Sequence, residues 1–167
     1  MFDDLPMPTS SSLSQTPRRG HAALRTGRIS APGRAYHLTL TTQQRTPLFQ
    51  EFDAACAAAA CLHDPVLTKG ARMLAWVVMP DHVHCLLQLD GQRSLGATIS
   101  TLKSGSARRI NRTLGRTGPV WSRAYHDHAL RGDEDLRATA RYIVANPIRA
   151  GLARKAGDYP FWNAIWL

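Results

Sequence analysis

The organisation of this chain follows from Met79-Pro80-Asp81-His82-Val83-His84-Cys85-Leu86-Leu87-Gln88-Leu89, a turn followed by a short strand. Because side chains alternate between the two faces of a strand, His82 and His84 point to the same side. The apolar residues that alternate with them fill the opposite face, as expected for a strand with one buried side. Two imidazoles on one face can clamp a metal ion, although two structural histidines are the commoner explanation of an isolated pair.

Hydrophobic patterning on both sides of this strand predicts an alternation of strands and helices. Strands are expected at 35–42, 72–79 and about 125–130, and helices at 47–62, 94–111 and 133–146. Ser94 is the expected N-cap of the second helix, and Pro47 is expected to open the first. The order strand-helix-strand-strand-helix-strand-helix predicts an α+β fold, a ferredoxin-like split βαβ sandwich with helices on one face of an antiparallel sheet and a further helix at its C-terminal side.

In this topology the first and third strands are central neighbours in the sheet. The first strand alternates between an apolar face, which carries Tyr36, Leu38 and Leu40, and a polar face. The polar faces of the two strands are therefore expected to align and to form a candidate functional surface. Its residues would be His37, Thr39, Thr41, His82, His84 and Gln88.

The composition limits the classes of function. The 167 residues carry a formal net charge of +9 and a pI of about 10.3, which favours a polyanionic partner. Residues 1–30 are rich in Ser, Pro, Gly and Arg and predict a flexible basic arm, which leaves one domain at 31–167. The three cysteines form no Cys-x-x-Cys motif, and no apolar run reaches membrane-spanning length. These features, with no secretory signal, predict a cytoplasmic protein without a membrane partner.

A basic stretch runs from Gly91 to His126 without a single acidic residue. It predicts a phosphate-binding track, although a charged run is often only a solvated face. A second histidine pair, His126 and His128, has a charged residue between its members. That pair is therefore expected to face DNA or to be structural, with metal binding as a minor alternative. The basic residues of the stretch are Arg93, Lys103, Arg108, Arg109, Arg112, Arg116 and Arg123.

Tyr142 and Asn146 lie four residues apart and share one face of the last predicted helix. Tyr142 falls beside the apolar stripe of that helix and not at its centre. A half-buried aromatic residue is the ordinary interpretation of Tyr142, and a helix cap is that of Asn146, because Pro147 follows. An amide oxygen at Asn146 could equally serve as a third metal ligand.

Several separated motifs, in the same order, resemble the HUH single-strand DNA transposases, and specifically the REP-associated tyrosine transposases. The similarity spans about residues 31–167 and does not cover the arm. The position of Ala35 departs from the family, where an aromatic residue is common. The matching segments are Trp76–His84, Tyr142–Leu152, Gly33–His37, Tyr125–Arg131 and Gly157–Pro160.

The resemblance implies an endonuclease and strand transferase with one catalytic tyrosine, Tyr142, on the C-terminal helix. His82, His84 and Asn146 match the ligands of a divalent metal, Mg²⁺ or Mn²⁺. The implied partner is single-stranded DNA that folds into a hairpin, such as a REP-like palindrome, and the product is a 5′-phosphotyrosine link. A monomer and a homodimer are both compatible with this assignment. The residues expected to contact DNA are Arg34, His37, Lys103, Arg108, Arg109, Arg112, Arg116, Arg123, His126, His128 and Arg149.

Three other functions fit the same residues. A hairpin-binding protein could keep the fold without catalysis, and a metal-dependent hydrolase could use water in place of Tyr142. A replication-initiator-type nickase would share the chemistry, but the small size of the chain and the lack of a second domain count against it.

Overall fold

The computed structural model describes residues 30–131 and 135–166, so all but the last residue of the predicted arm lies outside the described residues. The helices are α1 (Phe52–His63), α2 (Leu95–Thr113), α3 (Leu136–Val144) and the short α4 (Asn146–Arg149), with 3₁₀ turns η2 (Gln43–Arg45), η3 (Leu48–Gln50) and η4 (Ala156–Asp158). The strands are β1 (Ala35–Thr41), β2 (Ala71–Met79), β3 (His82–Leu89), β4 (His126–Ala129) and β5 (Trp162–Ala164).

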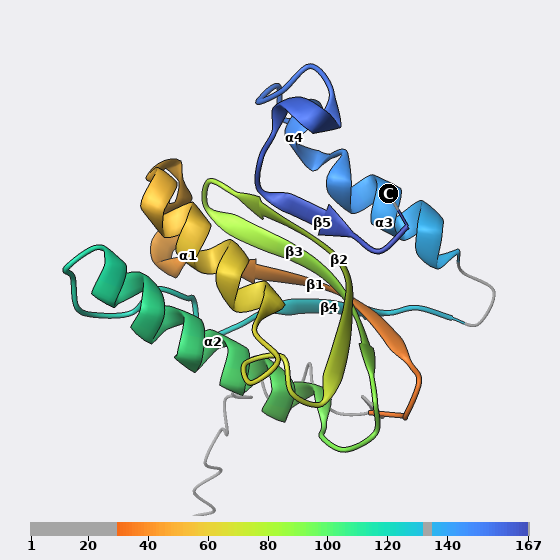
Figure 1. Cartoon of the computed structure of the whole chain (residues 1–167). Helices are drawn as coiled ribbons and strands as arrows, with labels where there is room; N and C mark the ends of the chain where they lie inside the picture. Colours follow the sequence, from red (N-terminus) through yellow and green to blue (C-terminus); the bar gives the residue numbers. More distant parts are fainter. Residues whose placement is uncertain (1–29, 132–134, 167) are drawn as a thin grey trace, which may run out of the picture.

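The strands form one antiparallel sheet in the order β4-β1-β3-β2-β5 (Figure 1). The predicted α+β, ferredoxin-like sandwich is confirmed, and β1 and β3 are central neighbours as expected. Strand β5 was not predicted. It comes from the C-terminal segment and extends the sheet by pairing with β2, so that Ala164 opposes Ala75 and Trp162 opposes Val77.

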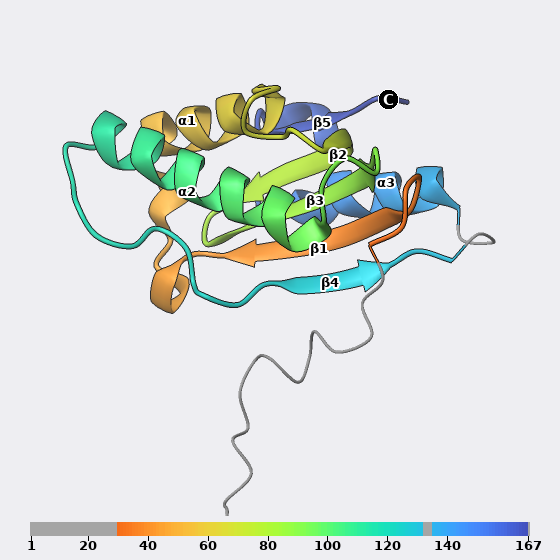
Figure 2. The same cartoon turned by 90° about the horizontal axis from the view of Figure 1, so that it is seen from below.

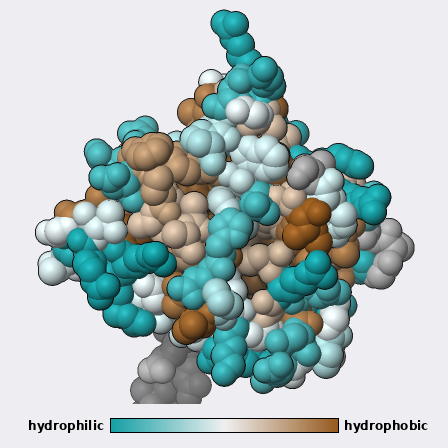
Figure 3. All heavy atoms as spheres, in the orientation of Figure 1, coloured by the Kyte–Doolittle hydropathy of each residue, from teal (hydrophilic) through white to brown (hydrophobic). Residues whose placement is uncertain are grey.

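Helices cover both faces of the sheet (Figure 2). Helices α1 and α2 lie on one face, where Leu38, Leu40 and Val83 pack against residues such as Ile99 and Leu102. Helix α3 lies on the other face, where Ile143 and Val144 pack on strand residues that include Leu74, Val77 and Leu86. The second face therefore combines an apolar half under α3 with the polar half that carries the histidines. On the surface seen in the view of Figure 1, apolar residues are interrupted by hydrophilic ones (Figure 3).

Two predicted helices have different bounds in the structure. Pro47 does not open α1, because a 3₁₀ turn at Leu48–Gln50 comes first and the helix begins at Phe52. The last predicted helix is divided into α3 and α4 around Ala145, since Pro147 has no N–H with which to continue the hydrogen-bond ladder. In the part of the chain that the structure describes, every helix is too short or too polar to cross a membrane.

Side chains cap the N-termini of two helices, and one of these caps, Ser94, was predicted. Ser94 accepts a hydrogen bond from the backbone N–H of Ala97 and begins α2. Asp135 accepts one from the N–H of Arg137 and begins α3. These local bonds fix where each helix enters the fold, and α3 in particular carries Tyr142.

Candidate active site

The pairing of β1 with β3 and β4 places five histidines on one face of the sheet. In the β1–β3 pair, Thr39 lies opposite His84 and Thr41 opposite His82. In the β1–β4 pair, His37 lies opposite His128 and Thr39 opposite His126. Directly opposed residues of an antiparallel pair share a face, so His37, His82, His84, His126 and His128 form one surface, called the histidine face below.

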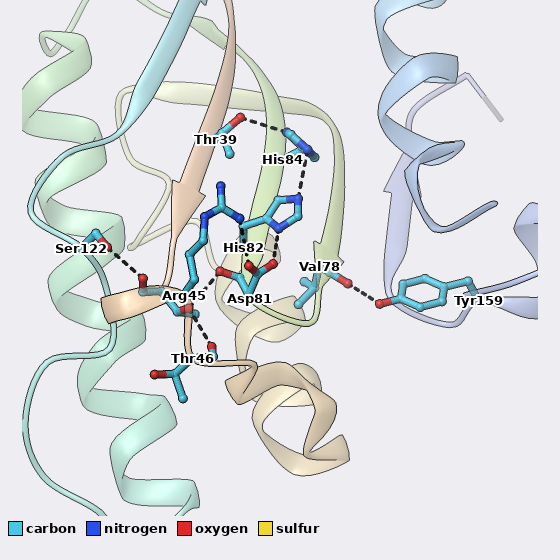
Figure 4. Close-up of polar contacts among 10 residues, drawn as sticks. Thr39, Arg45, Thr46, Val78, Asp81, His82, His84, Ser122 and Tyr159 are labelled. Carbon is cyan, nitrogen blue, oxygen red and sulfur yellow. Dashed lines mark hydrogen bonds and ion pairs between the residues drawn. The ribbon is translucent and has the colours of Figure 1, made fainter. Parts of the chain in front are cut away.

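Two of these imidazoles, those of His82 and His84, converge at the beginning of β3 (Figure 4). Nε2 of His82 and Nε2 of His84 are 3.2 Å apart. The other ring nitrogen of each histidine is already engaged: Nδ1 of His82 bonds to the carboxylate of Asp81, and Nδ1 of His84 lies 3.0 Å from the hydroxyl of Thr39. Both Nε2 atoms are thus turned toward one common point.

Burial disfavours the protonated forms of His84 and His37. The pKa of His84 is lowered from 6.5 to about 4, chiefly by burial and then by repulsion from His82 and His37. Burial likewise lowers the pKa of His37, with His128 adding to the effect. Burial alone would raise the pKa of Asp81, but hydrogen bonds and charge from His82 and Arg45 outweigh it and hold that pKa below its usual value. At neutral pH His84 is therefore neutral and Asp81 is ionised.

This donor set fits a divalent cation. Metal-bound histidines commonly donate their second ring N–H to a carboxylate, as His82 does to Asp81. Across residues 30–131 and 135–166, no group of three or more His, Cys, Asp or Glu side chains is placed to hold a metal. Among these described residues, further ligands would be of another kind, such as an amide oxygen, or would come from water or phosphate.

Tyr142 faces the same surface from α3. Its ring lies edge-on to His37 with 6.2 Å between the ring centroids, and Nε2 of His37 is 3.3 Å from Nδ1 of His84. The guanidinium carbon of Arg149 lies 5.0 Å from the centre of the Tyr142 ring, a cation–π contact. Tyr142 is 46% exposed and borders an open hollow of about 300 Å³ that His37, His128 and Thr139 also line. Its hydroxyl is therefore accessible to a large ligand on the histidine face.

Asn146 acts as a cap for α3. Its amide nitrogen donates to the backbone carbonyls of Tyr142 and Ile143, at 3.0 and 3.1 Å. The structure thus shows the capping role that the sequence left open. Metal ligation by Asn146 remains a prediction, and it would use the amide oxygen, because these two bonds occupy the nitrogen.

The model of the IS200-like transposase family matches residues 31–146, which is most of the described chain. The chain belongs to the IS200-like transposase family. This transposase is 29% identical over 144 residues to a protein of Haemophilus influenzae assigned as a REP-associated tyrosine transposase, with 77% of this chain and 78% of that protein covered. The REP-associated tyrosine transposase of Escherichia coli is 30% identical over 88 residues, which cover 52% of this chain and 50% of that protein. The predicted resemblance is confirmed.

Two solved structures share the fold of this IS200-like transposase. One is a REP-associated tyrosine transposase bound to a REP hairpin, with a TM-score of 0.62, 23% identity and coverage of 81% of this chain and 79% of that one. The other is the crystal structure of a Deinococcus radiodurans protein assigned as a transposase, with a TM-score of 0.51, 28% identity and coverage of 72% and 95%. Both support the sandwich architecture described above.

The residues predicted to contact DNA fall into two groups in this transposase. His37, His126, His128 and Arg149 lie on or beside the histidine face, and Arg34 precedes β1 at the far end of the sheet. The remainder lie on or after α2, which covers the opposite face, so the structure does not bring them to Tyr142. Lys103 donates to the carbonyls of Ser122 and Arg123, and Arg109 pairs with Asp64 at 3.8 Å. Arg108, Arg112 and Arg123 are exposed, and Arg116 is partly so.

Sequence reasoning missed the polar contacts that support the converging pair, His82 and His84. The sequence predicts Asp81 as a turn residue, whereas in the structure its carboxylate also orients His82. The position of Asp81 directly before the paired histidines is the signal that could have found this contact. Arg45 binds the other oxygen of the Asp81 carboxylate at 2.9 Å, and nothing local in the sequence pointed to it. The sequence predicts Thr39 on the correct face of the sheet but does not predict its contact with His84.

Proposed function

We propose that this transposase is a metal-dependent endonuclease and strand transferase for single-stranded DNA, which acts at hairpin-forming repeats through a 5′-phosphotyrosine intermediate. The placement of Tyr142 carries the proposal. A helix that begins more than forty residues after β3 sets an exposed tyrosine beside His37, and His37 contacts His84 of the converging pair. A nucleophile and a cation site on one open surface are the two parts that phosphodiester transfer requires.

The donor set favours Mg²⁺ or Mn²⁺ as the cation, bound by His82, His84 and the amide oxygen of Asn146. When bound, the ion would polarise the scissile phosphate and stabilise the negative charge that develops on it. The protein itself contributes a neutral imidazole at His84, because the pKa of His84 is lowered to about 4 and this ring stays unprotonated at neutral pH. It also contributes orientation, since Asp81 and Thr39 engage the Nδ1 atoms and leave Nε2 to bind.

Tyr142 performs the transfer. Its hydroxyl oxygen attacks the phosphorus, the bond from phosphorus to the 3′-oxygen breaks, and the phenolic proton is released as the 3′-hydroxyl forms. The 5′-phosphate remains esterified to Tyr142, so the energy of the phosphodiester is retained. Attack by the 3′-hydroxyl of another strand then rejoins DNA and restores the tyrosine. The exposed position of Tyr142 allows both strands to reach it in turn.

Hairpin DNA is the proposed substrate for two reasons. The Escherichia coli relative is named for its association with REP sequences, and the solved structure with the same fold carries a REP hairpin. The net charge of +9 and the exposed arginines of α2 supply the counter-charge that such a polyanion needs. Binding on the α2 side would be electrostatic, while cleavage takes place on the histidine face.

A denaturing gel tests the proposal directly. Purified protein is incubated with single-stranded hairpin DNA from the regions that flank its own coding sequence, with Mn²⁺ or with EDTA. The wild type should give a denaturation-resistant protein–DNA band with Mn²⁺ only, and Tyr142→Phe should give none. Tyr159→Phe is the matched control, because the Tyr159 hydroxyl donates to the carbonyl of Val78 and has a structural role.

The other outcomes separate the rival functions. Cleavage that persists in Tyr142→Phe without a covalent band indicates a hydrolase that uses water. Hairpin binding with neither band nor cleavage indicates a binding protein that keeps the fold. A band that survives in Tyr142→Phe and disappears in Tyr159→Phe would show that Tyr159, and not Tyr142, is the nucleophile.

A further inference from the structure

The turn after β1 contains two consecutive residues in an unusual backbone conformation. Gln44 has φ 54° and Arg45 has φ 53°, and neither is glycine. Left-handed conformations of such residues are strained and persist only where the surroundings enforce them. The pair lies at the edge of the candidate active site, which is where stored backbone strain most often has a functional cause.

Buried hydrogen bonds enforce this turn. Thr42 is 1% exposed, and its hydroxyl lies 2.7 Å from the carbonyl oxygen of Thr46 and 2.9 Å from that of Asp81. The backbone N–H of Thr42 also donates to the Asp81 carbonyl, at 2.9 Å. On the other side, Ser122 donates to the Thr42 carbonyl at 2.8 Å (Figure 4). The turn is therefore tied to the residue that precedes the paired histidines.

The consequence of the turn is a bond from Arg45 to Asp81. The guanidinium donates to Oδ2 of Asp81 at 2.9 Å, while Oδ1 of the same carboxylate accepts from Nδ1 of His82. Each oxygen has its own donor, so the carboxylate cannot rotate without losing one of them. Arg45 is 68% exposed on its side chain, and an ion pair at such a site contributes little to the free energy of unfolding. Orientation, and not stability, is what this contact can supply.

We propose that Arg45 is a positioning residue for the metal pair. It holds the Asp81 carboxylate in the plane that keeps the His82 proton on Nδ1, so that an unprotonated Nε2 is presented toward Nε2 of His84. The left-handed turn exists to bring Arg45 to this place. The role in cleavage rests on the proposed function, but the effect on His82 does not, because it is a property of the metal-free protein.

Asparagine substitutions in the turn test this inference. Asn adopts the left-handed conformation more readily than most residues, so Arg45→Asn removes the guanidinium without adding strain. Gln44→Asn is the matched control, with the same new residue in the same conformation one position earlier. Asp81→Ala removes the carboxylate itself, and Arg45→Lys restores a cation that can reach it.

Two measurements are made on each variant. The ring ¹⁵N resonances of His82 in the metal-free protein report which nitrogen carries the proton, and calorimetric titration with Mn²⁺ alone reports affinity. Asp81→Ala should weaken Mn²⁺ binding about 10- to 100-fold, the range typical of a lost outer-shell carboxylate, and Arg45→Asn about threefold to tenfold. Both variants should give His82 a mixture of tautomers. Gln44→Asn should match the wild type, and Arg45→Lys should recover part of the loss.

Two results would overturn the inference. If Arg45→Asn keeps the His82 tautomer and the Mn²⁺ affinity of the wild type, Arg45 does not position the pair. If Gln44→Asn weakens binding as much as Arg45→Asn does, the turn acts through its backbone and not through the guanidinium. The two proposals can also be separated. If Arg45→Asn shifts the His82 tautomer but the wild-type protein forms no covalent band with DNA, this inference holds and the proposed function is wrong.

Discussion

His84 should make the stability of the metal-free protein depend on pH. Its pKa is lowered from 6.5 to about 4 in the folded state, first by burial and then by the neighbouring His82 and His37. The unfolded chain takes up a proton on this ring below pH 6.5, but the folded chain resists it until about pH 4. The free energy of unfolding should therefore be fully retained above pH 6.5 and should fall as the pH drops toward 4.

The size of the effect follows from the same shift. The difference between 6.5 and about 4 corresponds to about 3 kcal/mol, at 1.36 kcal/mol per unit of pKa. His37, whose pKa is also lowered by burial and by His128, acts in the same direction. The Asp81 pKa lies below its usual 3.8, so the contribution of this carboxylate is lost only at more acidic pH.

Urea denaturation in EDTA, at pH 7 and at pH 4, measures the difference. The variant His84→Asn should lose about 3 kcal/mol less than the wild type between these two pH values. His63→Asn, at the end of α1 and away from the histidine face, controls for the replacement of a histidine as such and should keep the loss that belongs to His84. Equal losses in the wild type and in His84→Asn would show that the site does not hold this imidazole neutral, and the basis for a ready-made metal ligand would fall.

Four further variants probe the scaffold by thermal and urea unfolding. A Cβ added at Gly105 would lie 2.2 Å from Cδ2 of Leu67, whereas one at Gly96 meets nothing within 4 Å. Gly→Ala in the interior of α2, at Gly105, gains about 1 kcal/mol of helix propensity, whereas Gly96 lies in the first turn and gains less. Overpacking against Leu67 costs about 1–3 kcal/mol, so Gly105→Ala should be less stable than the wild type while Gly96→Ala is not, and a stabilised Gly105→Ala would contradict the contact. Ser94→Ala should cost about 1 kcal/mol through the lost N-cap, and no loss would show that the cap is dispensable. Ile143→Ala should lower the free energy of unfolding by about 2–5 kcal/mol, because this side chain of α3 is fully buried against the sheet. A smaller loss would mean that other contacts hold α3 on the sheet.

Local patterns in the sequence were sufficient for β1 to β4, for the three longer helices and for the faces of the strands, but not for β5 or the division between α3 and α4. Alternation placed Leu38 and Leu40 in the core and His82 and His84 together on the other side, as the structure shows. The N-cap at Ser94 was also visible, because a cap depends on residues within one turn. From the order of the elements the sandwich topology followed, since few arrangements satisfy it.

The tertiary structure alone brought the parts of the site together. Packing of Ile143, on α3, against the sheet sets Tyr142 beside His37. The left-handed turn brings Arg45 to Asp81. Neither contact could be predicted from the sequence, which also left open whether Asn146 caps α3. Alternation and capping depend on backbone geometry within a few residues, so they can be recognised in the sequence. Contacts between distant segments depend on strand register and on which side of the sheet a helix packs, and those are settled by the burial of the whole core.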